Sequence, residues 1–490
     1  MPVLSLNAES QTRPRALERA LLALFLLSLP LVNPWVRGDG VGYYAYARAP
    51  LIEHTLDFTH DYQAANKSFR EGRLDESGQP KATFRTITGH LENHFTVGPA
   101  LLWSPFLLVA HVGVLLAREF GSSVAADGFS APYRYAMAFG TALYGFLALL
   151  FSFRLARKYV DSLWAFVATL TIWWASSLPV YMYFNPSWSH AHSAFMAALF
   201  LWYWEQTRDG RTLRQWIILG LITGLMLNVY YPNLMLVAVL LVEALWQYRE
   251  YFRDTRELDT GRILSLLSRQ LLFGVTVCIC LLPTFISRLI VYGGPFKTGY
   301  LPLRDFLWES PVFLKVLLSA NHGLLSWTPV LVFSLLGLLW FALRSPRIGG
   351  PFLAATVAFY LFISIYPDWA GISSYGNRFF ISLTSLFVFG LAIALEICAG
   401  RLSNQRVALF VSTAVLASFT LWNLGMIYQW GTHLIPARGS ISFSEAASNQ
   451  FYVVPRQISS RLRSYFFHRG DMMRQIEQKD IEQLQKDAQP

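Results

Sequence analysis

The sequence is dominated by long apolar runs that carry few or no charged residues. An α-helix needs roughly 20 apolar residues to cross a lipid bilayer, and about eleven segments of this chain approach or exceed that length. They are residues 20–36, 135–153, two segments within 162–204, two within 215–248, 270–287, 327–343, 348–367, 379–395 and 407–426. The sequence therefore predicts an all-α, polytopic membrane protein with about 11 transmembrane helices.

The composition agrees with this fold class. Charged residues make up 14% of the chain and hydrophobic residues 54%, whereas soluble domains contain about 25% charged residues. This apolar excess must face lipid, which excludes a soluble enzyme, a disordered scaffold and a disulfide-stapled secreted module. The net charge of +10 is typical of basic loops on one side of a membrane and gives no reason to expect a nucleic-acid partner.

Short basic loops recur between the apolar runs and predict the topology. If eleven spans alternate from a cytoplasmic N-terminus, all of these loops fall in the cytoplasm, as the positive-inside rule requires. They lie at residues 13–19, 154–158, 208–214, 249–269, 344–347 and 401–406. A twelfth apolar run, 93–117, would reverse this order if it crossed, so we expect a helix that lies on or dips into the outer leaflet.

The chain is expected to have two parts. Residues 1–430 form a transmembrane domain that includes a long outer loop, 37–132, and an uncleaved first span. Residues 431–490 form a polar tail on the outer side, and its last segment, 470–490, is expected to be an exposed helix or a frayed end. The preference for Arg over Lys suits a bacterial genome. We therefore expect the protein in the bacterial cytoplasmic (inner) membrane, with its site on the outer face.

The first candidate for chemistry is Asp39, two residues beyond the first span. It lies in the segment 37–44, where flanking glycines allow close approach to a substrate, and Tyr43 and Tyr44 follow as candidate substrate-binding residues. A carboxylate at the outer end of a membrane helix can take a proton from an acceptor at the membrane surface. The alternative is a solvated acid near a turn.

Two further groups lie in the same outer loop. Asp57 and Asp61 are four residues apart, a spacing that shares one face of a helix, and could bind substrate or a divalent cation, although a solvated face fits equally well. His90, Glu92 and His94 alternate before Gly98, which suits metal ligation or the orientation of a hydroxyl group. We expect no certain cofactor and leave a divalent cation open.

Other candidates begin or flank later spans. His190 and His192 stand at the outer start of a span, where polar groups indicate function or simply the membrane interface. Lys297, followed by Tyr300, lies in a glycine-rich outer segment and could pair with a phosphate. The alternative for Lys297 is a turn with a snorkelling lysine.

Arg378 is the strongest candidate for a phosphate clamp. It opens a span from the outer side, after Trp369 in the segment 368–378. An unpaired Arg entering the membrane is costly, so we expect an anionic partner, either Asp368 or a lipid-linked phosphate.

With these features, the layout resembles the GT-C superfamily of integral-membrane glycosyltransferases, which includes protein O-mannosyltransferases and lipid A aminoarabinose transferases. The resemblance covers the N-terminal half best: one span, a large outer loop, then paired spans with basic inner turns. Asp39 matches the position of the family's first-loop catalytic acid, although Gly40 replaces the usual Glu. His94 before Gly98-Pro99 resembles a His/Lys-Pro-Pro element, and segments 321–329 and 369–378 look like a bacterial, functionally obscure branch.

The resemblance implies transfer of a sugar from a polyprenyl-phosphate donor to a lipid, glycan or protein acceptor, among membrane lipids. Asp39 would act as the general base, and Arg378 with Lys297 would hold the donor phosphate. A transporter or flippase of lipid-linked sugars is one alternative, and it would predict inverted repeats and charges at mid-membrane. A non-catalytic protein of envelope assembly is another, and it would tolerate the loss of Asp39.

Overall fold

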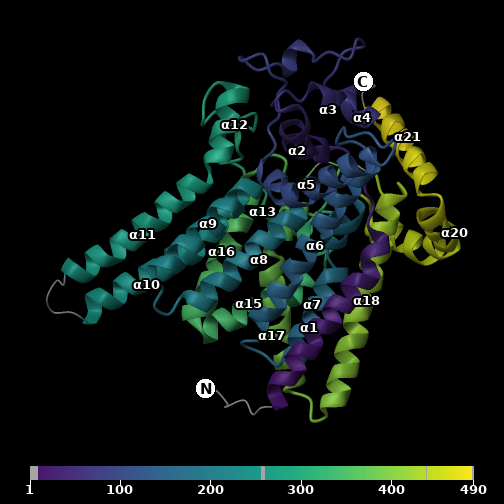
Figure 1. The fold of residues 1–490 in the computed structure, drawn as a ribbon. Helices are drawn as coiled ribbons and strands as arrows, with labels where there is room; N and C mark the ends of the chain where they lie inside the picture. The colour runs from purple at the N-terminus through teal and green to yellow at the C-terminus, as the bar shows by residue number, and fades with distance from the viewer. Residues whose placement is uncertain (1–8, 255–259, 372, 437–438, 488–490) are drawn as a thin grey trace.

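A computed structural model describes residues 9–254, 260–371, 373–436 and 439–487, and within these residues the regular structure is helical apart from two isolated β-bridges. The helices form a bundle with the N-terminus at one end and the C-terminus at the other (Figure 1). Each predicted span overlaps a helix, although the first of these helices ends at Ser28, well before the predicted end at residue 36, and the all-α prediction is confirmed. These helices are α1 (Glu9–Ser28), α6 (Ala131–Ala156), α7 (Ser162–Trp174), α8 (His190–Thr207), α9 (Leu213–Val229), α10 (Ala238–Asp254), α11 (Thr260–Cys280), α15 (Leu331–Arg344), α16 (Pro346–Ile365), α17 (Thr384–Ala399) and α18 (Gln405–Gly431).

Six helical segments among the described residues are long and apolar enough to cross a membrane. Four further apolar helices are shorter, 10–17 residues: α7, α9, α12 (Leu282–Tyr292) and α15. A helix that is apolar over this length is stable only in protein or lipid surroundings. The chain is therefore a multi-pass membrane protein.

The end of the bundle that holds the N-terminus is tied together by ion pairs between the predicted cytoplasmic loops. Glu18 of α1 pairs with Arg154 in the last turn of α6 and with Arg157 just after it, at 2.8 and 3.3 Å. Arg211 before α9 pairs with Glu243 of α10 at 3.0 Å. Two more pairs lie at the same end, Lys158 after α6 with Glu205 of α8, and Arg347 of α16 with Glu250 of α10. These basic segments therefore share one end of the bundle, as the predicted topology requires.

The twelfth apolar run forms α5 (Gly98–Glu119), which is one of the six helices long enough to cross. The segments that precede and follow it nevertheless both contact α2 (Asp39–Arg48), at the end of the bundle opposite the N-terminus. Tyr46 donates a hydrogen bond to the carbonyl of Asn93 before α5, and Tyr44 donates one to the carbonyl of Gly128 after it. A helix with both ends on one side agrees with the expectation that α5 dips into the outer leaflet.

The outer loop after α2 is held by a buried ion pair. Arg48 donates two hydrogen bonds to Asp61, at 2.6 and 2.8 Å, and both side chains are buried. Asp57 precedes the short helix α3 (Thr59–Gln63), is exposed and accepts hydrogen bonds from Thr59. Asp57 and Asp61 therefore do not share a helix face, and the prediction that this pair binds substrate or a cation is wrong because Arg48 occupies Asp61.

The C-terminal tail is not the exposed or frayed helix that the sequence led us to expect. Helix α21 (Arg469–Asp487) packs against the outer loop, where the carboxylate of Glu477 accepts a hydrogen bond from the backbone amide of Ser68. Asp480 of α21 pairs with Arg37 at 2.6 Å. Helix α20 (Val454–Phe467) precedes it, and the hydroxyl of Tyr465 donates to the carbonyl of Leu31. Local charge content predicted exposure, and these contacts with distant segments override it.

Asp61→Ala is expected to destabilise the protein by about 3 kcal/mol, because it leaves the buried Arg48 without its main counter-ion. Chemical unfolding of the detergent-solubilised protein measures the change. Asp57→Ala is the matched control and is expected to cost at most about 1 kcal/mol, since it removes only an exposed turn contact. Equal costs for the two variants would contradict the assignment of Asp61 as a structural residue.

Candidate functional site

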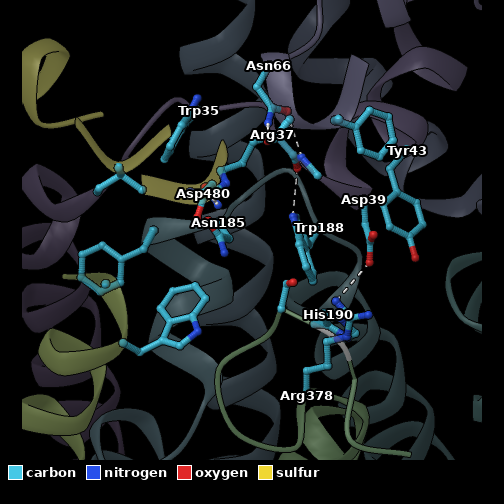
Figure 2. Close-up of a pocket in the computed structure, with 18 of the residues that line it drawn as sticks. Trp35, Arg37, Asp39, Tyr43, Asn66, Asn185, Trp188, His190, Arg378 and Asp480 are labelled. Atoms are coloured by element: carbon cyan, nitrogen blue, oxygen red, sulfur yellow. Dashed lines mark hydrogen bonds and ion pairs between the residues drawn. The ribbon is translucent and has the colours of Figure 1, made fainter. Parts of the chain in front are cut away.

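A cavity of about 1380 Å³ opens at the end of the bundle opposite the N-terminus. Its walls come from the start of α2, the segment 184–190, α12, the segment 366–379 and the C-terminal tail (Figure 2). Six of the residues singled out in the sequence line it together: Asp39, Tyr43, His94, His190, Tyr300 and Arg378.

Asp39 is the first residue of α2, where the free amides of the first turn favour a negative side chain. The glycines on either side of Asp39 allow close packing of the backbone. A Cβ at Gly40 would lie 1.9 Å from the hydroxyl oxygen of Ser187, so only glycine lets α2 approach this segment. Gly38 has a φ of +53°, which glycine adopts without strain. These contacts leave the Asp39 carboxylate 33% exposed, on the cavity wall.

Arg378 is the ion-pair partner of Asp39. Its NH1 lies 3.0 Å from Oδ2 of Asp39, and its guanidinium lies 4.5 Å from the centre of the Trp188 ring. The expected partner was Asp368 or a lipid-linked phosphate. The structure instead pairs the two strongest candidates of the sequence with each other (Figure 2).

The guanidinium of Arg378 retains donors for another ligand. Its side chain is 9% exposed, and its Nε makes no hydrogen bond to the residues that the structure describes, while NH1 serves the ion pair with Asp39. Gly371, with a φ of +65°, lets the preceding loop come close: a Cβ there would lie 3.2 Å from Nε. Because buried polar groups are normally hydrogen-bonded, this Nε donor indicates an anion site.

Another part of the cavity wall combines aromatic rings with Arg288. His94 packs against Tyr300 with ring centres 5.1 Å apart, and Tyr300 packs against Tyr231 at 5.6 Å. Arg288 of α12 lies 4.9 Å from the centre of the Tyr231 ring and also lines the cavity. Burial lowers the pKa of His94 to about 4, so its imidazole is neutral near pH 7 and can orient a hydroxyl group.

The remaining predicted residues do not line the cavity. His192 is buried beside the rings of Trp103 and Tyr144 because, two residues after His190 on α8, it faces another direction. Lys297 is exposed on its loop and does not line the cavity. Tyr44 is buried with its hydroxyl on Gly128, and Trp369 is half-buried beside the cavity.

No group of three His, Cys, Asp or Glu side chains that could hold a metal ion occurs among the described residues. The sequence reasoning also missed several lining residues. Arg288 was detectable, since an arginine inside an apolar outer segment is costly without a role. Trp188 and Tyr230 carried no such signal, because apolar runs in membrane proteins are rich in aromatic residues.

The fold and the cavity define a multi-pass membrane protein with a polar site at one end of its helical bundle. No protein-family model matches the chain, and no curated protein matches it in sequence. Among solved structures, the chain is similar to the crystal structure of ArnT from Cupriavidus metallidurans bound to undecaprenyl phosphate. The sequences are 14% identical, the similarity covers 89% of this chain and 75% of that chain, and the TM-score is 0.46. These values leave the family of the chain unassigned.

His94→Gln is expected to weaken the dependence of stability on pH. The folded-state pKa of about 4 lies below the ordinary value of 6.5, so the unfolded chain binds more protons within this window. The wild type therefore loses stability as the pH falls from 6.5 to 4, by on the order of 2 kcal/mol from this residue. Unfolding at pH 7 and pH 4.5 measures it, with the exposed His468→Gln as control. An unchanged pH dependence in His94→Gln would show that His94 is not buried as described.

Proposed function

We propose that this protein is a glycosyltransferase of the bacterial cytoplasmic membrane. It would move a sugar from a polyprenyl-phosphate donor to an acceptor on the outer face, in line with the GT-C resemblance of its sequence. The observation that carries the proposal is the Asp39–Arg378 pair on the wall of a large cavity at the end of the bundle opposite the N-terminus. A carboxylate next to an arginine with spare donors supplies the two groups that the reaction needs.

Arg378 serves the leaving group. When the bond between the sugar and the lipid phosphate breaks, negative charge develops on the phosphate oxygen. A guanidinium fixed by Asp39 and Trp188 already points at this charge and needs no reorganisation, which lowers the barrier by about 3 kcal/mol. Arg288, which sequence analysis did not select, offers a second cation across the cavity in the place expected of Lys297.

Asp39 serves the acceptor. Its Oδ2 faces Arg378, so Oδ1 is left to accept the proton of an acceptor hydroxyl group. The hydroxyl oxygen forms the new bond to the anomeric carbon, the bond to the phosphate oxygen breaks, and the sugar inverts. The proton passes to Asp39, and the lipid phosphate leaves with the electron pair.

No specific observation favours either of the two alternative functions. A transporter of lipid-linked sugars requires charged residues near mid-membrane, and the ion pair of this cavity lies at one end of the bundle. A non-catalytic assembly protein would have no use for spare guanidinium donors beside a carboxylate.

Asp39→Asn is expected to reduce transfer at least about a hundredfold, because the amide cannot accept the proton. The assay follows labelled sugar from a polyprenyl-phosphate pool into membrane lipids, with purified protein in vesicles. Asp57→Asn is the matched control, an exposed acid of the same loop that does not line the cavity. Full activity in Asp39→Asn would reject Asp39 as the base, and no transfer by the wild type with any membrane acceptor would reject the transferase.

Arg378→Lys is expected to lower kcat about a hundredfold, because lysine keeps the charge but loses the planar fork that contacts Asp39 and phosphate together. Arg304→Lys, at an exposed arginine of the outer side, is the control and should retain wild-type kcat. A rise in KM for the donor with kcat unchanged would contradict a role in stabilising the leaving group.

A further inference from the structure

After α18 the chain turns back and packs beside that helix, through a segment that includes α20. We term this segment, residues 443–469, the tail anchor. Gln450 donates a hydrogen bond to the carbonyl of Leu421, and a Cβ at Gly425 would lie only 2.0 Å from the side-chain amide of Gln450. Because a helix rises roughly 1.5 Å per residue, Leu421 lies about 15 Å before the end of α18 at Gly431. Since α18 is long and apolar enough to cross a membrane, the tail anchor lies beside the last turns of a membrane span (Figure 1).

The tail anchor exposes aromatic side chains at this level. Phe451 is 68% exposed, Tyr452 66% and Phe467 77%, and none of the three lines the cavity. The side of α20 that does line the cavity carries other residues, Ile458 and Leu462. Exposed aromatic side chains beside the end of a span are typical of the head-group region of a bilayer.

Helix α20 needs a further surface to be stable. Of its 14 residues only Val454 and Tyr465 are buried, and isolated helices of this length are marginal in water. Interfacial helices gain stability when their apolar side chains insert between lipids and their arginines reach the head groups. The side chains that α20 exposes are of these two kinds, and they include Phe467 and Arg463.

The tail anchor is also strongly basic. Between Glu445 and Asp471 the sequence contains no acidic residue and four arginines: Arg456, Arg461, Arg463 and Arg469. Within the described part of the chain, none of the four pairs with a carboxylate; Asp471 pairs with Arg474, and Asp480 pairs with Arg37. Arg469 donates hydrogen bonds to the backbone carbonyls of Pro30 and Val32, which leave its charge uncompensated. A cluster of uncompensated arginines at the end of a span fits an anionic lipid surface.

We infer that the tail anchor docks on a bilayer surface that carries anionic lipids. Its exposed aromatic side chains would lie among the head groups, and its arginines would pair with lipid phosphates. The lipid is here the supporting surface and not a substrate, so the inference goes beyond the proposed transferase and does not depend on it.

Docking also affects the cavity, because α21 follows α20 directly. Met473 of α21 lines the cavity, and Asp480 of the same helix pairs with Arg37, two residues before Asp39. A tail anchor held on the bilayer therefore keeps α21 in place as one wall of the site.

A second copy of the chain fits this surface less well. In a symmetric dimer the same patch of both copies would meet, and the arginines of one tail anchor would face those of the other. Like charges that face each other disfavour association, whereas anionic head groups compensate them.

The test is hydrogen exchange of the full chain in vesicles of phosphatidylcholine, alone or mixed with phosphatidylglycerol. The amides of α20 are expected to exchange more slowly in the mixed vesicles, because anionic head groups hold the tail anchor in place. Arg456→Gln combined with Arg463→Gln is expected to reduce this protection about fivefold for each arginine. High salt should cancel the difference between the two kinds of vesicle, since it screens the charges.

Two further variants complete the test. Arg304→Gln is the matched control, an exposed arginine outside the tail anchor, and should exchange as the wild type does. Phe467→Ser removes an apolar contact and no charge. It should therefore speed the exchange of α20 about tenfold in both kinds of vesicle, and the effect of phosphatidylglycerol should remain.

Three results would overturn the proposal. Equal exchange of α20 in the two kinds of vesicle would remove the preference for an anionic surface. The same loss of protection in Arg304→Gln would show a general effect of charge and no docking by the tail anchor. Protection that rises with protein concentration in lipid-free detergent would assign the surface to a second copy. None of these readouts uses sugar transfer, so they stay distinct from a failure of the proposed transferase.

Discussion

The ion pair between Arg378 and Asp39 is the interaction on which the site depends. An arginine at the outer start of a membrane helix is costly unless an anion meets it, and Asp39 provides that anion from a segment far away in the chain. The pair joins the start of α2 to the segment just before α17, and the ring of Trp188, from a third segment, lies against the guanidinium. The ion pair holds these distant segments together. Because it leaves the Nε donor of Arg378 without a hydrogen bond, the same guanidinium can also bind a negatively charged ligand.

Ion pairs also position the other segments of the bundle. At the end that holds the N-terminus, carboxylates such as Glu18 and Glu243 meet the basic loops and fix neighbouring helices. At the opposite end, Arg48 and Asp61 fix the outer loop, and Arg37 and Asp480 bring the tail over the cavity. Charged residues make up only 14% of the chain. Each buried ion pair therefore determines which distant segments lie together, whereas the apolar surfaces determine only that the helices pack into a bundle.

Sequence reasoning predicted the helices well because hydrophobic length is a local property, and each apolar run became a helix. It also selected Asp39, Arg378, His94 and Tyr300, since polar residues beside spans are few and costly. It could not predict that Asp39 pairs with Arg378, or that Asp61 pairs with Arg48, because these ion pairs depend on tertiary contacts. The prediction for the C-terminal tail failed for the same reason. A polar helix is predicted to be exposed unless its partner surface, here the loop between α2 and α5, is known.

The central claim is that a polyprenyl-phosphate sugar reacts at the Asp39–Arg378 pair. A structure of the full chain with a non-transferable analogue of such a donor tests it most directly. The account predicts a phosphate oxygen within about 3 Å of the Arg378 guanidinium, with the sugar in the cavity beside the Asp39 carboxylate. A donor bound outside the cavity, or inside it without contact to Arg378, would contradict the account.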